Sequence, residues 1–269
     1  MYKAPICIGG IGGSGTRLFA QILNSDDSIY MGPCINDTDD NIVFTFLFKR
    51  LEVLTMKYEQ LDKLFTIFRK VMMSIKLNKT EINIVKELYN NGTSQDYLYN
   101  RKHTFNELLK YSNKNLKNTT IDWGWKEPNT HMILPFLLKK YKNLKYIHIM
   151  RNGLDNAFSK NQNQLKFWTK SKPSPHNNLK YWVYVQKKII ELQQKYPKNI
   201  LIIKFEEFVK NPDKYIAILA DFIQKDLDVE KIKKIIKIPD TIDQFKHHSL
   251  KYFDKNDLAF LRSVGYNTN

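Results

Sequence analysis

The chain has 269 residues, which suits one large domain or two small ones, and its 42% hydrophobic and 13% aromatic residues argue against intrinsic disorder. No apolar run reaches the about 18 residues that a membrane span needs. Lys and Arg number 43 against 27 Asp and Glu, and the net charge of +16 favours polyanionic partners. The lysines are spread along the chain beside abundant asparagine, a pattern that an AT-rich genome also produces.

The N-terminal residues and the cysteine content indicate the cellular compartment of the protein. The stretch MYKAPICIGGIGG holds one Lys and a short apolar run broken by glycines, unlike a signal peptide. Only Cys7 and Cys34 occur, so we expect no disulfide framework and a cytoplasmic protein. No Cys or His stands at metal-ligand spacing, and we expect no metal site. Any contact with a membrane would be peripheral.

The first predicted elements enclose a glycine-rich turn. Residues 4–9 (APICIG) predict a buried strand, and residues 15–24 predict a helix with a regular apolar face. Between them, Gly10 and Gly15 have the spacing of a phosphate-binding loop, but Thr16 and Arg17 replace the Lys and Ser or Thr that serve a magnesium-bound triphosphate. A glycine turn without a ligand is the plain alternative. The interpretation we favour is an anion site formed by Gly12, Gly13, Ser14, Gly15, Thr16 and Arg17.

A helical region follows, and after it strands and helices alternate. Residues 41–78 are expected to be helical, and residues 80–111 to continue in helical and loop pieces. The later strands are predicted at 119–126, 144–150 and 200–205, with helices at 130–141, 154–163, 177–196, 206–210 and 212–225. Alternation of this kind indicates a single α/β domain with a central parallel sheet. We interpret residues 41–115 as a helical insertion after the first helix, on the acceptor side.

Arg151 follows the predicted strand 144–150, so it lies at the carboxyl end, where open parallel sheets bind ligands. Ser159 comes eight residues later, about two turns along the next predicted helix. The two side chains could therefore meet at one phosphate. Alternatively, Arg151 caps a strand at the surface and Ser159 is a buried helix hydroxyl.

Several short motifs occur together in a recognisable order between residues 4 and 266. Ser14-Gly15-Thr16 follows the first strand, and Lys126-Glu127-Pro128 follows a middle strand. RNGLDNAFS places Arg151, Asp155 and Ser159, and FEEFVKNP begins at Phe205. A helix with a central Trp182 precedes that last motif, and the chain ends in an L-x-x-x-G-Y pattern. In this arrangement the chain resembles sulfotransferases that use 3′-phosphoadenosine-5′-phosphosulfate (PAPS).

The resemblance implies which residues would bind the donor PAPS. Ser14-Gly15-Thr16 would hold the 5′-phosphate of PAPS, Arg151 and Ser159 the 3′-phosphate, and Phe205 would lie near the adenine. A donor without a triphosphate chain would also explain a loop that lacks the lysine and the magnesium ligand. This chain departs from many relatives at Gly13, where a basic residue is common, and at Arg17, which could supply the displaced cation.

Sulfuryl transfer by in-line displacement needs a positioned cation and a base for the acceptor. We expect Lys126 to be the cation. The stretch 37–40 offers carboxylates, of which we favour Asp37 as the base, because Asp39 or Asp40 could cap the next helix. His131 is the rival candidate, ahead of the His247-His248 pair. The expected acceptor is a hydroxyl or amine of a glycan or another small molecule.

Other functions remain open at this point. A small-molecule kinase with a degenerate loop would need ATP and magnesium. A non-catalytic nucleotide-binding relative would agree with Gly13. A nucleic-acid-binding protein would explain the charge and use the aromatic residues for stacking, but no basic cluster with interleaved aromatics stands out.

Overall fold

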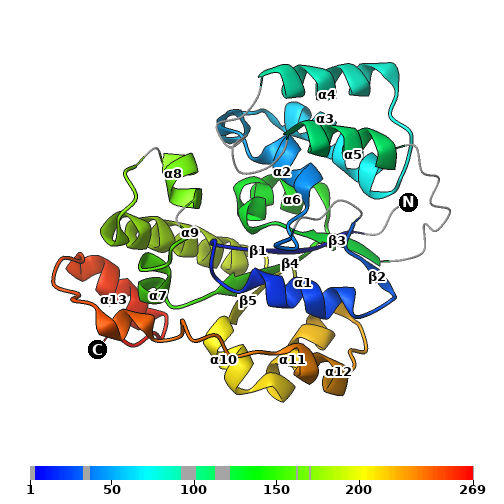
Figure 1. The fold of residues 1–269 in the computed structure, drawn as a ribbon. Coiled ribbons are helices and arrows are strands. Elements are labelled where there is room, and N and C mark those ends of the chain that lie inside the picture. Colours follow the sequence, from blue (N-terminus) through cyan, green and yellow to red (C-terminus); the bar gives the residue numbers. More distant parts are fainter. Residues whose placement is uncertain are drawn as a thin grey trace.

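The computed structural model describes residues 4–32, 37–91, 101–112, 122–161, 163–169 and 171–268 (Figure 1). These residues form a sheet of five parallel strands in the order β2-β3-β1-β4-β5. The strands are β1 (Ile6–Gly10), β2 (Ile29–Tyr30), β3 (Asp122–Lys126), β4 (Lys145–Met150) and β5 (Ile200–Lys204). The predicted α/β fold with a central parallel sheet is confirmed.

The strand order fixes the place of the ligand site. The chain passes from β3 on one side of β1 to β4 on its other side, and the pairs Ile8–Lys126 and Gly10–Ile149 set the register. In an open parallel sheet, ligands bind at the carboxyl ends of the strands where the order reverses. This point lies just beyond Gly10, at the glycine-rich turn.

Helices cover both faces of the sheet because strand residues alternate between two buried clusters. Ile6 and Ile8 face a cluster shared with α1 (Thr16–Asn24), α10 (Phe205–Lys210), α11 (Pro212–Ile223) and α12 (Val229–Ile235). Cys7 faces the other cluster, which includes residues of η2 (Pro128–Ile133), α6 (Leu134–Lys140), α9 (Pro175–Lys195) and α13 (Lys255–Ser263). None of the helices in the described ranges combines the length and apolarity that crossing a bilayer requires.

The helical region after α1 is joined to the core of the sheet. It contains α2 (Ile42–Phe48), η1 (Leu51–Leu54), α3 (Tyr58–Met72), α4 (Lys79–Asn91) and α5 (Arg101–Tyr111). Phe44 of α2 stacks on Trp125 of β3 with ring centroids 5.5 Å apart, and Phe68 of α3 meets the same indole edge-on at 5.0 Å. The described part of this region therefore packs on β3 through aromatic side chains.

The predicted elements differ from the structure in several places. The helix predicted at 154–163 is only α7 (Gly153–Ala157). Beyond it the Ser159 N–H bonds the Asn156 carbonyl three residues back (3.1 Å) instead of continuing the α-helical pattern, and the same carbonyl accepts from Asn178 of α9 (2.7 Å). The two-residue β2 was not predicted, residues 41–78 form separate helices, and Phe205 begins α10 rather than ending a strand. Cys34 and residues 119–121 lie outside the described residues.

Candidate active site

The glycine-rich turn between β1 and α1 has the backbone of an anion-binding loop. Gly13 and Gly15 have φ angles of +86° and +92°, which side chains rarely tolerate, and a Cβ at Gly15 would lie 2.3 Å from the Phe205 ring. Gly15 is also the N-cap of α1, and no side chain caps this helix end. The first N–H groups of α1 therefore point toward the pocket without intrahelical acceptors, as phosphate sites require.

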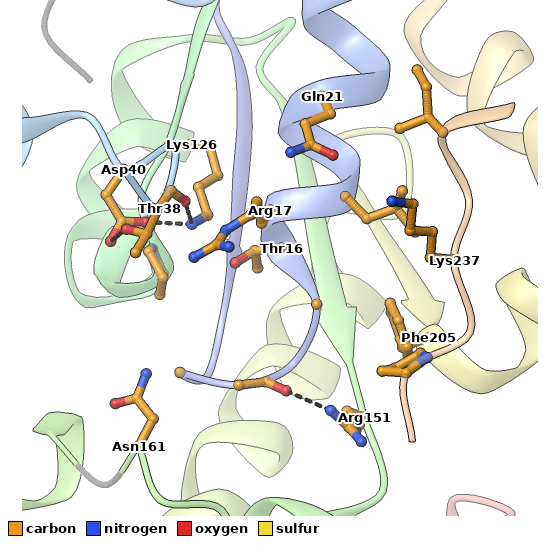
Figure 2. Close-up of a pocket in the computed structure, with 17 residues that line it drawn as sticks. Thr16, Arg17, Gln21, Thr38, Asp40, Lys126, Arg151, Asn161, Phe205 and Lys237 are labelled. Carbon is orange, nitrogen blue, oxygen red and sulfur yellow. Dashed lines mark hydrogen bonds and ion pairs between the residues drawn. The ribbon is translucent and has the colours of Figure 1, made fainter. Parts of the chain in front are cut away.

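A cavity of about 620 Å³ opens at the loop (Figure 2). Arg151, Phe205 and Lys237 lie on one side of the loop in this view, and Lys126 and Asp40 lie on the other. The Arg17 side chain extends from α1 toward the Lys126 side. The remaining lining residues include Gly12, Gly13, Gly15, Thr16, Leu18, Gln21, Thr38, Pro128, Asn161, Ile235 and Pro239.

Arg151 is held rigidly at the end of β4. It is 8% exposed, and its guanidinium donates to the carbonyl of Gly13 (3.2 Å) and to the carbonyl (2.5 Å) and hydroxyl (2.8 Å) of Thr241. Trp182 of α9 donates to the Arg151 carbonyl (3.1 Å). Arg151 Nε is buried and has no hydrogen-bond partner within the described ranges. An orphaned charged donor beside a glycine loop fits a site for a bound anion.

Lys126 and Asp40 form an ion pair on the opposite side of the cavity. Lys126 is 4% exposed, and its ammonium pairs with Asp40 and donates to the carbonyl of Thr38 (2.9 Å). The Asp40 side chain is 23% exposed. Asn41, and not Asp40, caps α2, because the Asn41 side chain accepts from the Phe44 N–H (2.9 Å). Asp40 also accepts the Thr38 hydroxyl (2.8 Å) and lines the cavity together with Lys126.

The other predicted site residues lie farther from the cavity. Asp37 is exposed and is not among the lining residues, and neither is Ser14, whose buried Oγ has no partner in the described part of the chain. Ser159 follows α7, with its Oγ 3.2 Å from the position that a Cβ of Gly13 would take. His131 lines a different cavity of about 390 Å³, beside Leu54 and α9. Burial lowers the pKa of His131 to about 4.

Comparison with known proteins now identifies the family. A sequence model of the sulfotransferase family matches residues 5–229. The chain belongs to this family. No curated protein sequence matches the chain.

Two solved structures show the same fold as this sulfotransferase. The sulfotransferase domain of the olefin synthase of Synechococcus PCC 7002 is 15% identical with a TM-score of 0.58, and the match covers 100% of this chain and 98% of that one. The sulfotransferase domain from the curacin biosynthetic pathway is 12% identical with a TM-score of 0.54, covering 99% of both chains. At these identities the likeness concerns the fold alone.

Two acidic residues of the sequence motifs in this sulfotransferase stabilise backbone segments next to the site. The Asp155 carboxylate accepts the N–H groups of Asp243 (2.9 Å) and Phe245 (3.1 Å), which fixes the segment that carries Thr241. The Glu206 carboxylate accepts the Asn152 N–H (2.8 Å), next to Arg151. These two acids hold the backbone around Arg151 rather than lining the cavity.

Three residues that line the cavity belong to none of the sequence motifs described above. Asn161, Lys237 and Gln21 reach the cavity from three separate elements. Gln21 lies four residues after Arg17 on α1, so helical spacing alone could have placed both on one face. Lys237 comes from the segment after α12, and nothing in its local sequence indicates the cavity. Within the described ranges, no three His, Cys, Asp or Glu side chains gather in a way that could hold a metal ion.

A buried histidine makes the fold of this sulfotransferase sensitive to acid. His148 of β4 is fully buried, between the Tyr146 hydroxyl (3.0 Å) and Gln186 Oε1 (2.9 Å). Burial lowers the pKa of His148 to about 3. The neutral ring therefore contributes stability that is fully present above pH about 6.5, its ordinary pKa, and is lost as the pH falls toward the folded value. Buried Glu127 opposes this trend, because its pKa is raised to about 7 and its contribution is lost as the pH rises.

We expect His148→Gln to flatten the pH dependence of stability. As the pH is lowered from about 6.5 to 5, the free energy of unfolding should decrease less steeply in the variant than in the wild type. The two slopes should differ by up to about 1.4 kcal/mol per pH unit, because the variant takes up one proton fewer on unfolding. Urea unfolding at several pH values measures this slope in both proteins. The slope, and not the absolute stability, is the readout, since the substitution also disturbs packing. Equal slopes would contradict the assigned pKa direction.

Proposed function

We propose that this sulfotransferase transfers a sulfuryl group from PAPS to a hydroxyl or amine of a glycan or another small acceptor, by in-line displacement without a metal. The observation that carries the proposal is one cavity in which a glycine loop without the triphosphate lysine lies between Arg151 and the Lys126–Asp40 pair. A donor with two separated phosphate groups and a sulfate needs cations at separated points of one cavity, and this arrangement supplies them.

The residues present fit such a donor. In this proposal, Thr16, Arg17 and the N-terminus of α1 bind the 5′-phosphosulfate, and Arg151, Ser159 and Lys237 bind the 3′-phosphate. Arg151 lines the cavity and is 8% exposed, so its guanidinium offers a positive charge to an anion bound there. Apolar walls for the adenine come from Phe205, Ile235 and Pro239.

The Lys126–Asp40 pair would perform the chemistry. The acceptor oxygen forms a bond to sulfur while the bond from sulfur to the phosphate oxygen breaks, which releases 3′,5′-adenosine bisphosphate (PAP). Lys126 stabilises the negative charge on the transferring and leaving oxygens, and Asp40 takes the acceptor proton. The region after Asp40 begins with α2, and we infer that residues 41–115 form the acceptor side. The cytoplasmic location stays a prediction from the sequence.

A pair of aspartate variants distinguishes the two candidate bases. We expect Asp40→Asn to lower kcat by about 10²–10⁴-fold, because the amide cannot accept the acceptor proton. Asp37→Asn should leave kcat nearly unchanged, since the exposed Asp37 side chain does not line the cavity. PAP affinity should stay similar in both variants. A large loss in Asp37→Asn with none in Asp40→Asn would return the role to Asp37.

A transfer assay tests the function as a whole. The protein is incubated with PAPS carrying radiolabelled sulfate, a chelator, and a panel of neutral and charged sugars, phenols and amines. We expect labelled product from at least one acceptor despite the chelator. Phosphate transfer from ATP with magnesium, in the absence of any sulfate transfer, would instead support a kinase.

A further inference from the structure

Helix α8 (Asn163–Thr169) contacts the phosphate loop through one hydrogen bond. Gln164 Oε1 accepts the N–H of Gly12 at 3.0 Å, and the Gln164 side chain is 5% exposed. The oxygen must face Gly12, because a backbone N–H can only donate. This N–H is thus committed to α8 rather than to a ligand in the cavity. Gln164 Nε2 is buried without a partner among the described residues, so the hydrogen bond of this side chain that the structure shows is the one to the phosphate loop.

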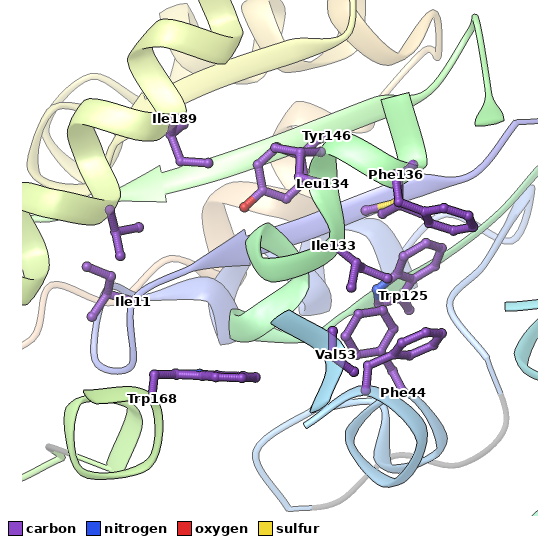
Figure 3. Close-up of a cluster of buried hydrophobic side chains, with 14 of the residues drawn as sticks. Ile11, Phe44, Val53, Trp125, Ile133, Leu134, Phe136, Tyr146, Trp168 and Ile189 are labelled. Carbon is purple, nitrogen blue, oxygen red and sulfur yellow. The ribbon is translucent and has the colours of Figure 1, made fainter. Parts of the chain in front are cut away.

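The same helix also contacts the turn that follows Lys126. Trp168, one turn after Gln164, donates its indole N–H to Asn129 Oδ1 at 2.7 Å. Asn129 in turn donates its backbone N–H and its amide to the two oxygens of Glu127, at 2.6 and 2.7 Å. Glu127 is 1% exposed and directly follows Lys126. Figure 3 draws Trp168 in the buried cluster that also contains Ile11, the residue before Gly12.

We propose that Gln164 is a positioning residue for sulfuryl transfer, and that α8 sets the distance between the phosphate loop and Lys126. This proposal rests on the proposed function, because it assigns the loop to the donor and Lys126 to the transferring group. Gln164 and Trp168 are four residues apart, so they lie on one face of α8, about 6 Å apart along its axis. One short helix therefore joins both halves of the reacting site.

In-line displacement depends steeply on this distance. A misplacement of about 1 Å between reacting groups can slow a reaction by about 10²-fold without abolishing binding. Release of the loop from α8 should therefore affect turnover more than it affects donor affinity. A residue that only stabilised the fold would not produce this split.

The test compares Gln164→Met with Gln194→Met. Methionine keeps the length of the side chain and removes the acceptor, and Gln194 is an exposed residue of α9 that serves as the matched control. Hydrogen exchange of the loop amides, measured without ligand, should be faster at Gly12 in Gln164→Met and unchanged in the control. Gln164→Glu, which retains an oxygen acceptor, should restore slow exchange. In the transfer assay, Gln164→Met should lower kcat by about 10²-fold with PAP affinity changed by about threefold or less.

Each outcome decides a separate point. Unchanged exchange at Gly12 or unchanged kcat in Gln164→Met would overturn the positioning role, and so would equal losses of kcat and PAP affinity. If Gln164→Met does not fold, Trp168→Phe tests the other contact of α8, because it removes the indole donor to Asn129 while keeping an aromatic ring. A lower kcat with PAP affinity retained supports the proposal, and an unchanged kcat overturns it. A wild-type protein that neither binds PAP nor transfers sulfate would refute the proposed function, while the exchange of Gly12 would still decide whether Gln164 holds the loop.

Discussion

Replacement of Lys126 by Met is expected to slow sulfuryl transfer by about 10²–10³-fold while PAP binding changes little. Lys126 is a buried cation at the carboxyl end of β3, and loss of a single preorganised donor to a developing negative charge costs about 2.7–4 kcal/mol of the barrier. PAP lacks the sulfuryl group, so its affinity should depend less on this ammonium. Single-turnover rates and calorimetric titration measure the two effects separately.

Lys140→Met is the matched control for Lys126→Met. Lys140 also pairs with an aspartate, Asp62, but does not line the cavity. Its replacement should leave the transfer rate close to that of the wild type. Because Lys126 and Asp40 would act as a unit, the double variant Lys126→Met, Asp40→Asn should be little slower than the worse single variant. A transfer rate retained in Lys126→Met would remove Lys126 from the chemistry.

Replacement of Arg151 by Met is expected to weaken PAP binding by about 10²–10³-fold. Truncation of one partner of a buried charge pair costs about 2–5 kcal/mol, and each 1.4 kcal/mol is tenfold in affinity. The large loss follows from the burial of Arg151 at 8% exposure and from its fixed position on Gly13 and Thr241. Calorimetric titration with PAP measures the change directly.

A second nucleotide separates recognition by Arg151 from support of the pocket. Adenosine 5′-monophosphate lacks the 3′-phosphate, so its affinity should change by about threefold or less in Arg151→Met. Arg262→Met, at an exposed arginine of α13, should leave both affinities unchanged. Equal losses for both nucleotides would mean that Arg151 acts by holding the Gly13 and Thr241 segments and not by binding a 3′-phosphate.

The parts of the site that come from one local stretch could be predicted from the sequence. The loop from Gly12 to Arg17 is recognisable because a buried strand, left-handed glycines and a helix start follow one another directly. Arg151 and Lys126 were also placed correctly at strand ends, since parallel strands bring their carboxyl ends to one edge.

The parts that depend on packing between distant segments could not be predicted. Asp40 was interpreted as one of two candidate helix caps, but Asn41 caps α2 and leaves Asp40 to Lys126, 86 residues away. Ser159 lies beyond the end of α7, where the Asn156 carbonyl accepts both the Ser159 N–H and the side chain of Asn178 of α9. His131 lies in a cavity that residues of η1, η2, α6 and α9 line together. In each case the decisive partner is remote in the sequence, and no local pattern reports it.

The most direct test of the central claim is a calorimetric titration of the wild-type protein with PAP in the presence of a chelator, beside a titration with ATP and magnesium. The account predicts that PAP binds with micromolar or tighter affinity without any metal, because Arg151 and the loop N–H groups recognise two separated phosphates. Binding of ATP with magnesium, and no binding of PAP, would contradict it.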